Sequence, residues 1–169
     1  MKISAASSDK WCLQEPPFMF QQTYATPLND LSTFVHTLLD SFEANKGVVC
    51  IEQLVFNPRE LIWYLKGLGI VTDESRLEHS TLEAEDTAEV VNILECLLGQ
   101  WIDFAFFPSS KEFVSYADHD EYTTVFTPTV EILNLLRSKM QAQSFKEIEN
   151  WTWSRPRSQS NTKGTDTDV

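Results

Sequence analysis

Apolar residues recur at three-and-four spacing between residues 31 and 42, which is the period of an amphipathic helix. Asp30 precedes this stripe and is a suitable N-cap, and Gly47 follows it as a stop signal. The sequence therefore predicts a helix that begins after Asp30 and ends before Gly47. Its buried stripe comprises Leu31, Phe34, Val35, Leu38, Leu39 and Phe42.

The same signals predict three more helices. The segment "NPRELIWYLKGLG" has a capping residue followed by proline at the first helical position, and glycine at its end. The apolar positions from Ala84 to Leu98 suggest a helix that ends at Gly99. The last helix is expected from Thr127, with Pro128 at its first position and Leu133 and Leu136 on its buried face.

The apolar period changes to two residues after residue 100. In "WIDFAFF", Ile102, Phe104 and Phe106 share one face of a predicted strand. "EFVSY" and "YTTVF" continue as short strands, and "PSSK" and "DHDE" connect them, which is typical of a three-stranded antiparallel meander. The run "VVCIEQLVF", residues 48–56, is too short for periodicity to distinguish a buried strand from a helix.

Together these elements predict an α+β protein in which about four helices pack on a small antiparallel β-meander. A single globular domain is expected over residues 11–154, which is an ordinary size for one core. Residues 1–10 are predicted to be a flexible N-terminus. Residues 155–169 are predicted to be a disordered tail, because this segment is rich in Ser, Thr and charge and has Val169 as its one aliphatic residue.

The net charge is the outlying feature of the composition. Twenty-five Asp and Glu against thirteen Lys and Arg give a formal charge of −12. Such a chain repels nucleic acid and anionic membranes, and it attracts cationic partners. With no N-terminal apolar segment, no run near the ~20 apolar residues of a membrane span, and three widely spaced Cys, a soluble cytoplasmic protein is expected.

One acidic cluster lies between Thr72 and Glu89, a segment that contains seven acidic residues and one basic residue, Arg76. Glu83, Glu85 and Asp86 fall near the predicted start of a helix, so the positive end of the helix dipole explains them. They also suit a patch that faces a basic partner. The sequence leaves both interpretations open.

The second cluster is Asp118 to Glu121, within "YADHDEYTTVF". Asp side chains stabilise turns through hydrogen bonds to the backbone, so a turn between two strands is one interpretation. A calcium loop is excluded, because Thr123 and Thr129 stand where Gly and Glu are needed. The chain also lacks nucleophile-elbow, phosphate-loop and zinc-helix motifs, so no catalytic residue, metal or cofactor is predicted.

The small size, the acidity and the strand, "ADHDEYTTVF", strand, helix order of Trp101 to Met140 resemble the small immunity proteins of bacterial polymorphic and contact-dependent toxin systems. The resemblance implies a non-enzymatic protein that binds a basic cognate toxin, such as a nuclease, and occludes its active site. A hydrolase using Asp118 and Glu121 as general acid and base, or an acidic DNA mimic, are alternatives. The oligomeric state is not predicted. The candidate partner-binding residues are Asp118, Asp120, Glu121, Glu83, Glu85 and Asp86.

Overall fold

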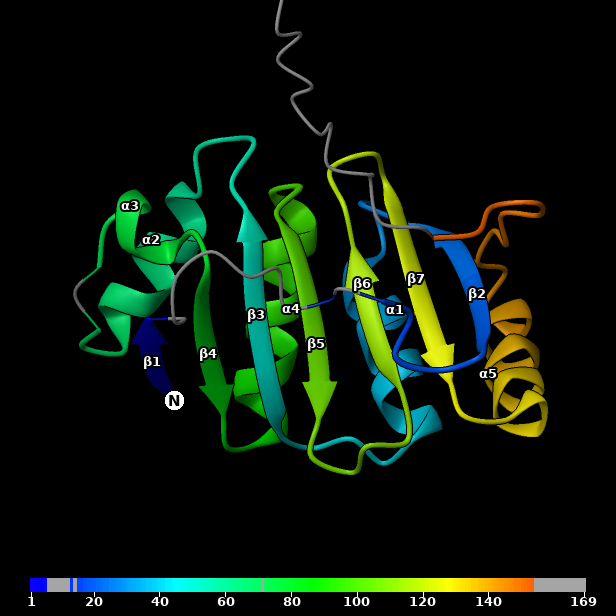
Figure 1. Cartoon of the computed structure of the whole chain (residues 1–169). Helices are drawn as coiled ribbons and strands as arrows, with labels where there is room; N and C mark the ends of the chain where they lie inside the picture. Colours follow the sequence, from blue (N-terminus) through cyan, green and yellow to red (C-terminus); the bar gives the residue numbers. More distant parts are fainter. Residues whose placement is uncertain (6–12, 14, 71, 154–169) are drawn as a thin grey trace, which may run out of the picture.

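The computed structural model describes residues 1–5, 13, 15–70 and 72–153. Its central element is a seven-stranded sheet in the order β1-β4-β3-β5-β6-β7-β2 (Figure 1). All neighbouring strands are antiparallel. The strands are β1 (Lys2–Ala5), β2 (Phe20–Ala25), β3 (Gly47–Gln53), β4 (Ser80–Ala84), β5 (Asp103–Pro108), β6 (Val114–Ala117) and β7 (Tyr122–Thr127).

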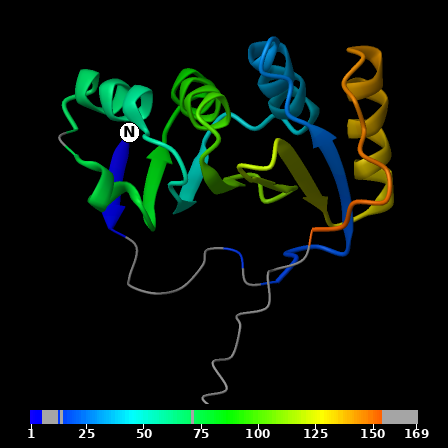
Figure 2. The same ribbon diagram turned by 90° about the horizontal axis from the view of Figure 1, so that it is seen from above.

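Helices cover one face of this sheet. They are α1 (Leu31–Ser41), α2 (Arg59–Gly67), α3 (Glu74–Leu77), α4 (Thr87–Gly99) and α5 (Val130–Ala142). Figure 2 shows α2, α4, α1 and α5 side by side above the sheet, in agreement with the contacts of α1 with α4 and α5 and of α2 with α4. The fold is therefore an α+β architecture of two layers, as predicted in class.

The main core lies between the helices and the sheet. Phe34, Val35, Leu38 and Leu39 of α1 are buried in it, as the helical stripe predicted. Ile102, Phe104 and Phe106 are also in this core, together with Leu136 of α5, so the predicted inward face of β5 is confirmed; Leu133 is buried too. Alternation along the strands sends every second side chain to the opposite, open face.

The open face of the sheet carries a smaller apolar cluster. Tyr116 and Phe126 contact Trp153 there, and Leu13 packs in the same cluster. The buried carboxylate of Glu52 accepts a hydrogen bond from the Leu13 backbone N–H at 2.9 Å. Segments from both ends of the chain thus cover the middle of this face, although neither belongs to a helix.

The sheet is larger than the predicted meander. The meander itself is confirmed as β5, β6 and β7. The undecided run, residues 48–56, is a strand up to Gln53, where β3 (Gly47–Gln53) ends. Strand β2, Phe20–Ala25, extends the sheet beyond the meander by pairing with β7. Strand β4 was not predicted, because it lies in the acidic segment and its last residue, Ala84, was assigned to a helix. Helix α4 starts later, at Thr87.

Several predicted helix boundaries and one terminus also change. Helix α1 ends at Ser41, before Gly47 as predicted, and the left-handed residue Glu43 lies just after its end. Pro58 and Thr129, not Asn57 and Thr127, are the N-cap residues of α2 and α5. Residues 2–5 form β1 where a flexible N-terminus was predicted. The predicted tail, residues 155–169, lies outside the described residues.

Candidate functional site: the β6–β7 turn

The candidate site is the turn that joins β6 to β7, which contains the acidic residues singled out in the sequence. Asp118 holds its backbone. One carboxylate oxygen, Oδ1, accepts the backbone N–H groups of Asp120 at 3.0 Å and Tyr122 at 3.3 Å. The backbone N–H of Asp118 also donates to the carbonyl of Tyr122 at 3.2 Å. Asp118 therefore has the turn-stabilising role that was one interpretation of this cluster.

A second carboxylate, Asp103, fixes the turn from the neighbouring strand. This residue begins β5 and is 3% exposed. Its Oδ1 accepts the backbone N–H of His119 at 2.8 Å and lies 2.9 Å from Nδ1 of the same imidazole. A charged side chain this deeply buried requires such partners. Asp103 was not a predicted site residue, because it lies in a predicted strand that is distant in sequence from the acidic cluster.

The pKa values of this pair follow from their environment. The hydrogen bond to Asp103 raises the pKa of His119 above its usual 6.5, and Asp103, Asp120 and Asp118 add to this through their charges. Burial raises the pKa of Asp103, and the hydrogen bond from His119 opposes that shift. Burial likewise raises the pKa of Asp118, against the effect of the backbone donors it accepts.

The remaining two acids of the turn point into solvent. The side chain of Asp120 is 68% exposed, and Glu121 is exposed as well. Glu121 occupies the left-handed region with a φ of 72°. Its carbonyl accepts the backbone N–H of Thr26 at 2.9 Å. Asp120 and Glu121 are thus presented by a backbone that is fixed on both sides.

An aromatic pair adjoins these exposed carboxylates. The rings of Tyr122 and Trp151 lie 4.8 Å apart between centroids, and Trp151 is 39% exposed. Tyr and Trp side chains are enriched at protein interfaces. Trp151 was not a predicted site residue, because it precedes the predicted tail and only the fold brings it to the turn.

The second predicted acidic patch lies elsewhere. Glu83 lies in the last part of β4, and Glu85 and Asp86 follow that strand. Strand β4 ends at the lower edge of the sheet in Figure 1, whereas the β6–β7 turn lies at the upper edge. Glu85 pairs with Lys2 at 2.9 Å. Asp86 caps α4 by accepting the backbone N–H of Glu89 at 2.9 Å. The structure therefore does not bring the six predicted residues together on one edge.

The capping role of Asp86 gives a prediction. The Asp86→Ala variant should lose about 1 kcal/mol of the free energy of unfolding, because the N–H of Glu89 loses its acceptor. Chemical denaturation of wild type and variant measures this loss. Glu83→Ala, which removes an exposed carboxylate without a cap, is the matched control. An equal stability of the Asp86→Ala variant and wild type would show that the cap contributes nothing.

The Asp103–His119 contact gives a prediction about pH. Because the folded-state pKa of His119 is raised, the folded state binds the His119 proton more tightly than the unfolded state does. The stabilisation that results is fully present below pH 6.5 and is lost as the pH rises through the folded-state pKa. The pKa of Asp103 is also raised, so the stability that this residue contributes is likewise lost with rising pH, starting above pH 3.8. We expect the melting temperature to fall as the pH rises above 6.5, with a smaller fall in His119→Gln. A wild type and a variant with identical profiles would contradict the coupling.

Neither a metal nor a membrane segment is indicated by the described residues. Within the part of the chain that the structure describes, no group of three or more His, Cys, Asp or Glu side chains is placed to hold a metal ion. None of its described helices has the length and apolar character of a membrane span.

A scan of protein-family models finds no match, and searches of curated proteins and of solved structures find none either. The function proposed for the chain therefore rests on its own geometry.

Proposed function

We propose that the chain is a cytoplasmic, non-enzymatic immunity protein that binds a basic cognate toxin, such as a nuclease, and occludes its active site through the β6–β7 turn. One observation carries this proposal. Asp120 and Glu121 are exposed on a turn whose backbone is fixed by Asp103 and Asp118, beside the exposed ring of Trp151.

The rigidity of the turn favours binding, because ordering flexible groups on binding costs free energy. The hydrogen bonds of Asp118 and Asp103 order the turn before any partner arrives. Asp120 and Glu121 then present negative charge at fixed positions. A nuclease holds phosphates in a basic cleft, and carboxylates can occupy the same place, so charge complementarity favours such a partner.

The aromatic pair supplies the apolar part of the interface. Interface residues that contribute most to binding are enriched in Trp and Tyr, surrounded by contacts that exclude water. Trp151, supported by Tyr122, is half-exposed beside the acids. We assign Glu83, Glu85 and Asp86 no direct role in this interface, because they lie at the other end of the strands.

The test uses the product of the gene adjacent to the one that encodes this chain. Cells that express that product should survive only when the wild-type chain is co-expressed, and the two purified proteins should form a stoichiometric complex in which the toxin's activity is lost. A catalytically inactive variant of the toxin should still form the complex. Survival without the chain, or a toxin that remains fully active in excess chain, would reject the proposal.

A further inference from the structure

We propose a second binding site on the open face of the sheet, which takes a small amphiphile consisting of an alkyl chain that ends in a carboxylate. The site is a hollow beside the turn that joins β5 to β6. It goes beyond the proposed function, since this hollow lies at the end of the strands opposite to the β6–β7 turn.

The floor of the hollow is apolar. Its volume is about 460 Å³, and its walls include Pro17, Phe18, Val48, Phe107 and Val114. Val48 and Phe107 are cross-strand partners on β3 and β5, and both are only half-buried. A hollow of about 300 to 1,000 Å³ with mostly apolar walls and a few polar groups is typical of small-molecule sites. The alkyl chain of the ligand would cover these half-buried side chains.

The rim of the hollow is a fixed structure. A Cβ atom on Gly47 would lie 2.6 Å from the carbonyl oxygen of Phe107, so glycine is needed for the close approach of β3 and β5 here. This approach lets the backbone N–H of Ser109 donate to the carbonyl of Lys46 at 3.0 Å. Lys111, in the left-handed region with a φ of 60°, closes the turn with a hydrogen bond to Pro108.

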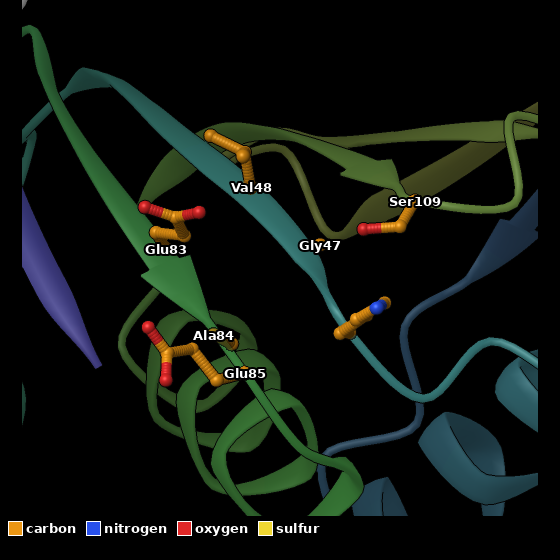
Figure 3. Close-up of a pocket in the computed structure, with 7 residues that line it drawn as sticks. Gly47, Val48, Glu83, Ala84, Glu85 and Ser109 are labelled. Carbon is orange, nitrogen blue, oxygen red and sulfur yellow. The ribbon is translucent and has the colours of Figure 1, made fainter.

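The charges of the rim favour an anionic head group. Lys111 lines this hollow, and Lys46 lines a polar hollow that adjoins it through Val48 and Ser109. Neither lysine has an ion pair among the described residues. Figure 3 shows the adjoining polar hollow, with Ser109 on one side of Gly47 and Val48 and with Glu83 and Glu85 on the other. Glu85 is already paired with Lys2. Lys111 at the apolar hollow, with Lys46 at the adjoining polar one, can bind the carboxylate of an amphiphile whose alkyl chain fills the apolar hollow.

The test is calorimetric titration of the full chain with decanoate, below its micelle-forming concentration and at low salt. Decyltrimethylammonium, with the same chain length and a cationic head group, is the second ligand. The variant Lys46→Glu, Lys111→Glu removes the rim charges. The variant Lys66→Glu, Lys146→Glu is its matched control, because both of these lysines are exposed, away from the hollow, and unpaired among the described residues.

We expect saturable one-to-one binding of decanoate, weakened about tenfold or more in the rim variant and changed less than about twofold in the control. Decyltrimethylammonium should bind more weakly than decanoate. The proposal is overturned by the absence of saturable binding, by equal binding to wild type and rim variant, or by tighter binding of the cationic amphiphile. That last result would indicate that Glu83, which lines the adjoining polar hollow, sets the charge preference in place of the lysines. None of these outcomes depends on a toxin, so the two proposals fail separately.

Discussion

Reversing both exposed charges of the β6–β7 turn should abolish protection. In the Asp120→Lys, Glu121→Lys variant, lysine ammonium groups would face the basic cleft that the carboxylates are proposed to fill. Desolvated charge pairs at interfaces typically cost about 2 kcal/mol or more when broken, which is about thirtyfold in affinity. We expect slower association as well, with a larger difference at low salt, because salt screens the attraction between exposed charges.

The control for this experiment carries the same change in net charge at a distant place. Glu74 is the first residue of the short helix α3 and Glu78 is its C-cap; both lie near the β1 edge of the sheet and are exposed. Their double replacement by lysine should leave binding within about twofold of wild type. Both variants should unfold at the same denaturant concentration as wild type, since exposed substitutions change stability by about 0.5 kcal/mol or less. A turn variant that protects cells as well as wild type would exclude the turn from the interface.

The largest effect on stability is expected from Phe106→Ala. Phe106 is fully buried and lies edge-to-face against Phe113 at 6.0 Å, and Phe113 stacks on Phe42 at 4.2 Å. Removing this ring leaves a cavity between β5 and α1, so the free energy of unfolding should fall by about 3 to 5 kcal/mol. Urea unfolding followed by tryptophan fluorescence measures this fall.

Phe107→Ala is the matched control, because it removes the same ring from the next residue of the same strand. Phe107 is half-buried on the opposite, open face, so its loss should cost less than half as much. If both variants lose the same free energy, the two faces of β5 contribute equally, and the core lies elsewhere than between β5 and the helices.

The sequence predicted best where its pattern was regular. The alternation of "WIDFAFF" predicted the inward face of β5 correctly, since Ile102, Phe104 and Phe106 face the helices. The sequence left strand β3 undecided because its apolar run shows no alternation. The structure explains this, since both faces of β3 are covered and Glu52, on the open face, is buried against Leu13. Strand β4 has only Leu82 and Ala84 as inward apolar residues. Two such residues in an acidic segment are too few to predict a strand.

The site could be predicted only in part. Asp118 and the following residues read as a turn, because an Asp side chain reaches the backbone two positions ahead and needs no distant partner. Asp103 is sixteen positions from His119, and only the pairing of β5 with β6 brings them together. A lone Asp in an otherwise apolar strand was the signal available, since buried charges require partners. Glu83 and Asp118 could not be assigned to opposite ends before the strand order was known.

The most direct test of the proposed interface is amide hydrogen exchange of the chain, free and in complex with the product of the adjacent gene. The interface proposed here predicts slower exchange on binding at residues 119–122 and at Trp151, with the exchange of residues 83–86 unchanged. Slower exchange confined to residues 83–86, or no change anywhere in the chain, would contradict the proposal that the β6–β7 turn binds a toxin.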